Sequence, residues 1–224
     1  MTIDLSASTE PEIVRAARVL TAVNAAAQAA DVDYLVVGAT ARTILSIGLA
    51  GTAPERATRD VDIAVEVATW ADFDHRLNVR GLREATASAE TVVLPGGLTV
   101  RVPAAPELAL LKLLTWWERR MITTRDAIDL ATMISWYSTG PYLDLLYEEE
   151  SALLAQHEYD PALAGAWLLG SLMPRLLDDA GKKALLRIVA DDDVLGRLAN
   201  DARGTRAPEL MRAMGAGIRH AVGM

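Results

Sequence analysis

Two aspartates one residue apart, Asp60 and Asp62, lie in the segment RATRDVDIAV (56–65), which otherwise alternates like a β-strand. Side chains at positions i and i+2 of a strand point the same way, so the two carboxylates converge and repel each other unless a cation lies between them. Magnesium prefers such oxygen ligands together with phosphate and water. The spacing therefore predicts a divalent-cation site, and the alternative is a strand face with solvated charges.

Gly38 stands upstream, between the apolar run DYLVV (33–37) and the helix-like segment ATARTILSIGL (39–49). At a junction of strand, glycine and helix the backbone can approach an anion, which the N-terminus of the helix favours. A phosphate held at Gly38–Thr40 and a magnesium ion held by the two aspartates would form the two halves of a nucleoside triphosphate site.

The segments VVGATARTILSIGLAG and ERATRDVDIAVEVATWADF resemble the AbiEii-like nucleotidyltransferases, whose better known members are toxins of bacterial toxin–antitoxin pairs. Gly38–Arg42 match the glycine-led turn of that family, and Arg56–Asp62 match its R-x-T-x-D-x-D motif. The resemblance continues through LALLKLLTWWERR, RDAIDLATMISWY and YDPALAGAWLLGSLM, so it covers most of the chain.

The resemblance implies roles for these residues one by one. The triphosphate would be held by Gly38, Ala39 and Thr40, with Arg42 nearby, and the two aspartates would bind magnesium. The chain departs from the usual pattern at Thr43, where an acid is expected, and at Ala39, which replaces a glycine or serine.

Lys112 matches the family's lysine that reaches the nucleotide phosphates, and Asp126 with Asp129 match its R/K-D-x-x-D motif, in which an aspartate contributes to the active site. Each residue also has a structural alternative. Lys112 could extend from its apolar helix to water. Asp126 lies three residues after Thr123, as in a capping box, and Asp129 is one helical turn from Arg125.

The implied reaction is magnesium-dependent transfer of a nucleoside monophosphate from an NTP to an acceptor, either RNA (such as the tRNA 3′ end) or a protein. The implied role is that of a toxin with a cognate antitoxin. Two alternatives stay open: a catalytically silent relative with a binding or regulatory role, and an aminoglycoside-type enzyme with a small acceptor. A local basic rim for an RNA acceptor is expected from Arg56, Arg59, Arg119, Arg120 and Arg125.

Nucleotidyltransferases of this superfamily carry a third carboxylate on a later core strand, and the segment that should hold it is not found here. WADFDHRL (70–77) runs almost directly into NVRGLREA (78–85). The acids that remain in the interval are Asp72, Asp74, Glu84 and Glu90, of which Glu90 is the least poor substitute. Loss of one ligand would weaken metal binding and the orientation of the nucleophile.

The helices and strands that we expect to position these residues together indicate an α+β fold. We expect a minimal nucleotidyltransferase-type mixed sheet with flanking helices over residues 1–103, followed by an all-helical domain over 104–224. The first part is predicted to contain a helix (8–30), strands (33–38 and 60–67), a helix (69–77) and a hairpin (91–102). Helices are predicted for the second part at 105–120, 123–137, 142–156, 161–177, 181–190 and 205–222.

Composition limits the cellular setting. The formal net charge of −8 makes the whole chain a poor general binder of nucleic acid. The chain has no cysteine, hence no disulfide or thiolate metal site, and we expect a cytoplasmic protein with no membrane span.

Overall fold

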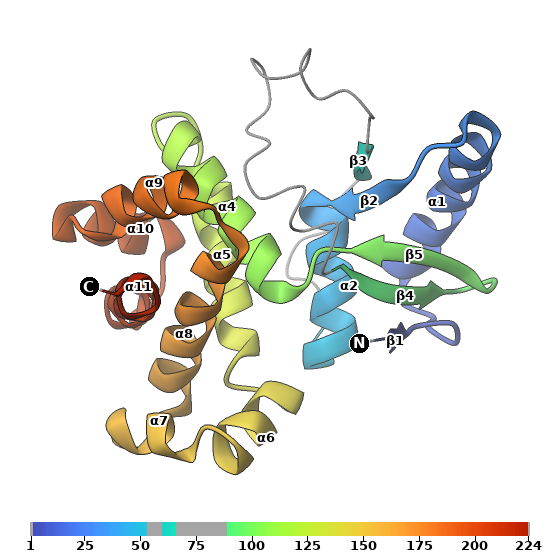
Figure 1. Cartoon of the computed structure of the whole chain (residues 1–224). Coiled ribbons are helices and arrows are strands. Elements are labelled where there is room, and N and C mark those ends of the chain that lie inside the picture. The colour runs from blue at the N-terminus through green and yellow to red at the C-terminus, as the bar shows by residue number, and fades with distance from the viewer. Residues whose placement is uncertain (1, 53–59, 66–88, 224) are drawn as a thin grey trace. The chain divides into compact units, whose positions relative to one another are not determined.

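The chain forms an α+β fold of two compact units in this computed structural model, which describes residues 2–52, 60–65 and 89–223. Met1–Leu108 make up the first unit and Ala109–Met224 the second. Figure 1 shows the strands within the first unit, whereas the second is built from helices.

The strands of the first unit form two sheets. The three-stranded sheet has the order β1 (Thr2–Asp4), β4 (Glu90–Leu94) and β5 (Leu98–Val102), with β1 parallel and β5 antiparallel to β4. The second sheet pairs β2 (Tyr34–Val37) with β3 (Asp62–Val65) in antiparallel register. β2 also lies beside β5, as Figure 1 shows.

Two helices of this unit, α1 (Pro11–Ala30) and α2 (Gly38–Ala50), contact each other. Pro11 occupies the first turn of α1, where a missing N–H costs nothing. α2 starts directly where β2 ends. The buried residues of α1 recur with helical spacing and are Ile13, Ala16, Ala17 and Leu20.

The first unit follows the predicted order of elements in most places. The strand ending at a glycine, the helix after it and the hairpin around Pro95-Gly96-Gly97 are confirmed. β3 begins at Asp62, two residues later than predicted, and the end predicted at residue 67 falls outside the described residues. Ile63 on its apolar face is 37% exposed. In the part of the chain that the structure describes, β3 pairs only with β2, so one edge lacks a covering strand. The helix predicted at 69–77 falls outside the described residues.

The second unit consists of successive helices, with no strand among its described residues. α4 begins in the first unit and continues into this one. The helices are α4 (Ala105–Arg119), α5 (Arg125–Trp136), α6 (Gly140–Glu148), α7 (Ser151–Gln156), α8 (Pro161–Leu172), α9 (Asp179–Val189), α10 (Asp192–Ala202) and α11 (Ala207–Val222), with a 3₁₀ turn at Met173–Leu176. Among the described helices, none is both long and apolar enough to cross a membrane.

Close contact between α8 and α11 forms the centre of the second unit. Glycines let the two backbones approach: a β-carbon at Gly217 would lie 2.9 Å from the backbone nitrogen of Ser171, and one at Gly170 would lie 2.9 Å from the carbonyl carbon of Met214. No side chain fits at either position unless the helices move apart.

Two elements have no counterpart in the sequence prediction. α10 begins after Asp191, whose carboxylate accepts hydrogen bonds from the backbone N–H groups of Asp193 and Val194. Its apolar residues have helical spacing, so the N-cap and this spacing are the signal that could have revealed it. β1 has three residues and is held by pairing with β4 about ninety positions later, which local sequence does not reveal. The predicted helix at 142–156 is two helices, α6 and α7.

Candidate functional site

The junction of β2 and α2 places three backbone N–H groups, those of Gly38–Thr40, in the first turn of a helix. N–H groups in a first turn have no partner within the helix. The N-cap residue is Val37, which makes no side-chain capping hydrogen bond. Gly38 has φ +65°, a conformation that side chains disfavour. This end of α2 carries partial positive charge and suits an anion.

Asp62 lies at this same junction. It is paired with Val37 across the β2–β3 ladder, one residue before Gly38. A β-carbon added at Gly38 would lie 3.0 Å from Cγ of Asp62 and closer still to its Oδ2. The Asp62 carboxylate therefore packs over Gly38 at the positive end of α2, and only glycine leaves room for it.

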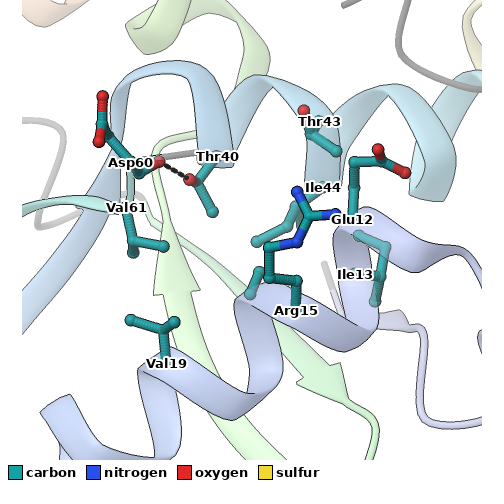
Figure 2. Close-up of a pocket in the computed structure, with 10 residues that line it drawn as sticks. Glu12, Ile13, Arg15, Val19, Thr40, Thr43, Ile44, Asp60 and Val61 are labelled. Atoms are coloured by element: carbon teal, nitrogen blue, oxygen red, sulfur yellow. Dashed lines mark hydrogen bonds between the residues drawn. The ribbon is translucent and has the colours of Figure 1, made fainter. Parts of the chain in front are cut away.

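Asp60 is tied to the same helix through its backbone. The buried hydroxyl of Thr40 donates a hydrogen bond to the Asp60 carbonyl oxygen at 3.1 Å, the contact dashed in Figure 2. The Asp60 side chain itself is exposed. Thr40 thus uses its hydroxyl to hold the aspartate segment, which leaves its backbone N–H for a phosphate. This contact could not be predicted from a local sequence pattern, because Thr40 and Asp60 are twenty positions apart.

A shallow hollow next to Asp60 is distinct from the carboxylate site. It lies between α1 and α2 and is mostly apolar, with Val19, Ile44 and Val61 among its lining residues. Figure 2 shows the Asp60 carboxylate pointing away from it. Thr43 also lines the hollow, and its buried hydroxyl has no hydrogen-bond partner. The Asp60 carboxylate therefore faces away from this hollow.

Arg42 does not present its charge to solvent. Its side chain is 4% exposed, and it already interacts with another group of the protein. Ala39 is half-buried between Gly38 and Thr40. The predicted phosphate contact of Arg42 stays a prediction, and it requires either the guanidinium or its surroundings to rearrange.

The donor set for a metal consists of the carboxylates of Asp60 and Asp62. Within residues 2–52, 60–65 and 89–223, no three His, Asp or Glu side chains gather as a metal group. Protein sites for magnesium often provide only one or two carboxylates, with phosphate and water completing the shell, so a magnesium site here stays a prediction. Of the candidates for a third carboxylate, Asp72, Asp74 and Glu84 fall outside the described residues. Glu90 begins β4 with one carboxylate oxygen buried.

Lys112, Asp126 and Asp129 form a buried ionic cluster in the second unit. The Lys112 ammonium lies 2.8 Å from Asp126 Oδ1 and 2.8 Å from Asp129 Oδ2. The Lys112 side chain is 13% exposed and that of Asp129 only 3%. Burial lowers the pKa of Lys112, but Asp129 and Asp126 raise it by more, so it lies above its ordinary value of 10.5. The lysine is therefore firmly charged.

This cluster decides between the structural alternatives for its members. The prediction that Lys112 extends to water is wrong, because two carboxylates hold it inside. The capping box at Asp126 does not form: the N-cap of α5 is Thr124, with no side-chain capping bond. Two of the three N–H donors of Lys112 are engaged, and the cluster carries a net charge of −1. A contact between Lys112 and a phosphate stays a prediction.

Of the five arginines expected to form a basic rim, Arg56 and Arg59 fall outside the described residues. Arg119 and Arg125 are exposed, whereas the Arg120 guanidinium lies 3.6 Å from the ring centre of Trp117. Trp116 is a core residue, and its indole N–H donates to Asp201 Oδ2 at 2.9 Å.

Comparisons with models of protein families, with curated proteins and with solved structures find no match to this chain.

Proposed function

We propose that the first unit binds a magnesium–nucleoside triphosphate and that the protein transfers the nucleoside monophosphate to an acceptor. Asp60 and Asp62 supply carboxylate oxygens for the metal, and the first-turn N–H groups of Gly38–Thr40 hold phosphate oxygens. The proposal agrees with the resemblance to AbiEii-like nucleotidyltransferases. Like that family, the protein would use RNA, such as the tRNA 3′ end, or a protein as acceptor, and would act as a toxin controlled by an antitoxin.

The observation that carries the proposal is the packing of the Asp62 carboxylate over Gly38. Two short motifs twenty-four positions apart come together at one end of α2, with an acidic group beside a glycine backbone. The hydrogen bond from the Thr40 hydroxyl to the Asp60 carbonyl oxygen holds the backbone of the second aspartate near the same helix. A cation between these carboxylates would lie next to any phosphate at the helix N-terminus, which is the arrangement that phosphoryl transfer needs.

In the proposed reaction, a hydroxyl oxygen of the acceptor forms a bond to the α-phosphorus. The bond from that phosphorus to the bridging oxygen breaks, and pyrophosphate leaves with the electron pair. The hydroxyl proton passes to water. When bound, magnesium supplies neutralisation of the charge that develops on the phosphates. The α2 backbone would hold the phosphates for the incoming oxygen, and positioning of this kind lowers the barrier to transfer.

Lys112, Arg42 and Asp126 are the proposed assisting residues. Arg42 would neutralise phosphate charge from within α2. Asp126 and Asp129 hold the Lys112 ammonium in one orientation within the second unit. A role of this lysine towards the nucleotide is part of the proposal. The roles of Lys112 and Asp126 can be tested apart from the metal site, since both residues belong to the second unit.

Transfer of label from α-phosphate-labelled NTPs, with magnesium and either total tRNA or protein as acceptor, tests the proposal. Asp60→Asn and Asp62→Asn should each lower transfer by about 100-fold or more, since a metal ligand matters at least as much as the groups that orient it. Asp33→Asn, an exposed aspartate just before β2, is the matched control and should keep full activity.

Equal incorporation by the wild type and both aspartate variants would instead support a silent relative with a binding role. Among the described residues the proposed metal site has two carboxylates and no third, and this favours the silent relative as the second candidate. Label appearing on an added aminoglycoside, but not on tRNA or protein, would identify the acceptor as a small molecule.

A further inference from the structure

The turn between α4 and α5 holds two apolar side chains out in solvent. Met121 is 75% and Ile122 85% exposed, the highest fractions among the large apolar side chains that the structure describes. Burying two such side chains on association is favourable, because apolar surface leaves water. Exposure of this kind, at adjacent positions, is typical of a contact surface.

Positive charge surrounds this apolar pair. Arg119, Arg120 and Arg125 lie within residues 117–125, with Glu118 as the one acid in that stretch. The local net charge is +2, in a chain whose total is −8. We call residues 117–125 the α4–α5 tip; it lies at one end of the α4–α5 helix pair, visible in Figure 1.

The backbone fixes the shape of the tip. The N–H groups of Ile122 and Thr123 both donate to the Arg119 carbonyl, at 2.8 and 3.0 Å. The N–H of Arg125 donates to the Thr123 hydroxyl at 3.3 Å. Because these bonds already hold the chain, a partner would meet a preorganised surface and pay little ordering entropy.

We propose that the α4–α5 tip is a docking surface for an acidic, amphipathic segment of another protein. The apolar side chains of that segment would cover Met121 and Ile122, and its carboxylates would face Arg119 and Arg125. An apolar centre with a charged rim is the usual anatomy of such an interface. Docking here does not depend on the transfer reaction proposed above.

The same side chains argue against a nucleic-acid surface. The arginines suit phosphates, but exposed Met and Ile gain nothing from a phosphate backbone. Stacking of bases requires an open aromatic face. Trp117 is the aromatic ring at the surface of the tip, and Arg120 already covers one of its faces at 3.6 Å.

A labelled synthetic peptide of about 18 residues, five helical turns, provides the probe, with leucines on one face and glutamates on the others. Its binding to the full chain is followed by fluorescence polarisation, beside a labelled oligouridine. The test variants are Met121→Ser/Ile122→Ser and Arg119→Glu/Arg125→Glu. The controls are Tyr147→Ser, an exposed aromatic in an acidic stretch, and Arg197→Glu, an exposed arginine on α10.

The peptide should bind the wild type and both controls. Met121→Ser/Ile122→Ser should weaken binding about ten-fold, as removal of an interface centre does, with the melting temperature unchanged. Arg119→Glu/Arg125→Glu should weaken binding and reduce its salt dependence.

Three results would overturn the proposal. One is absence of peptide binding, or binding that Met121→Ser/Ile122→Ser leaves intact. Another is binding of oligouridine alone, lost only in the arginine variant, which would make the tip a nucleic-acid surface. The last is a concentration-dependent dimer that Met121→Ser/Ile122→Ser dissolves, which would make it a self-association surface.

Discussion

The carboxylate of Asp62 packs over Gly38, in the space that a side chain at position 38 would take. The two residues belong to different elements, and the β2–β3 ladder brings them together. Glycine is thus required at position 38 for two reasons: the backbone has a positive φ, and the Asp62 carboxylate occupies the space of a side chain. These needs can be separated by mutation.

Gly38→Ala should destabilise the protein by about 1–2 kcal/mol from its backbone conformation alone, and more from the clash with Asp62. The matched control is Gly51→Ala: its φ is +61°, close to the +65° of Gly38, but a β-carbon there meets nothing within 4 Å. Urea denaturation should give the larger loss for Gly38→Ala. Stabilisation by magnesium with NTP, measured by thermal shift, should vanish only in that variant.

The double variant Gly38→Ala/Asp62→Ala isolates the clash. With the carboxylate removed, the alanine at position 38 should cost clearly less stability than it does beside Asp62, although the Cβ that Asp62→Ala keeps would still lie 3.0 Å away. Equal losses for Gly38→Ala with and without Asp62 would show that the two residues do not press on each other.

Local pattern was sufficient to predict the order around the candidate site. The apolar run before Gly38, the helical spacing after it and the turn at Pro95-Gly96-Gly97 each follow from neighbouring residues, and each is confirmed. α10 was not predicted although its N-cap and apolar spacing indicate a helix, and its packing against α5 and α11 stabilises it.

Contacts between residues that are far apart in the sequence could not be predicted from local patterns. For Lys112 in its apolar helix, extension to water was the structural alternative, yet its carboxylate partners lie one helix later and hold it inside. The Thr40–Asp60 hydrogen bond likewise depends on how β3 returns beside β2. Both outcomes depend on tertiary packing, which no short motif encodes.

Lys112→Met should destabilise the protein by about 3–5 kcal/mol at neutral pH, because it leaves two buried carboxylates without their cation. The pKa of Lys112 is raised in the folded state, so its contribution is fully present below 10.5 and is lost as pH rises through the folded pKa. The wild type should therefore lose stability above pH 10.5 faster than Lys112→Met does. Urea denaturation at a series of pH values measures both.

Lys183→Met, an exposed lysine on α9, is the control and should follow the wild type throughout. A Lys112→Met variant as stable as the wild type at pH 7 would mean that the ionic cluster contributes nothing to folding.

Gly217→Ala should destabilise the second unit, since its β-carbon would lie 2.9 Å from both the Ser171 nitrogen and the Trp167 carbonyl carbon of α8. These are backbone atoms, so the helices themselves must separate, at a cost of about 1–3 kcal/mol or more. Gly196→Ala lies in α10 with nothing within 4 Å and should stabilise by about 1 kcal/mol through helix propensity. The melting temperature should fall for Gly217→Ala and rise for Gly196→Ala. A shift in the same direction for both variants would contradict the close packing of α8 and α11.

Asp160 caps α8 and also pairs with Arg206. Its Oδ1 accepts from the N–H groups of Ala162 and Leu163, at 2.9 and 3.2 Å, and its Oδ2 lies 2.5 Å from Nη2 of Arg206. Asp160→Ala should lower the free energy of unfolding by about 1–2 kcal/mol at pH 7, mainly because the cap of α8 is lost. Arg206→Gln should lower it by less than about 1 kcal/mol, because the ion pair with Asp160 is exposed.

The pH dependence of Asp160 has a definite sign. The hydrogen bond from Arg206, and less strongly those from the α8 backbone, lower the pKa of Asp160 below 3.8 against the opposing effect of burial. The stability it provides is thus present above pH 3.8 and is lost as pH falls through the folded pKa. Urea denaturation should show the wild type and Asp160→Ala converging in this acid range. A difference that stays constant from pH 7 to pH 2 would mean that the ionised carboxylate is not what stabilises the start of α8.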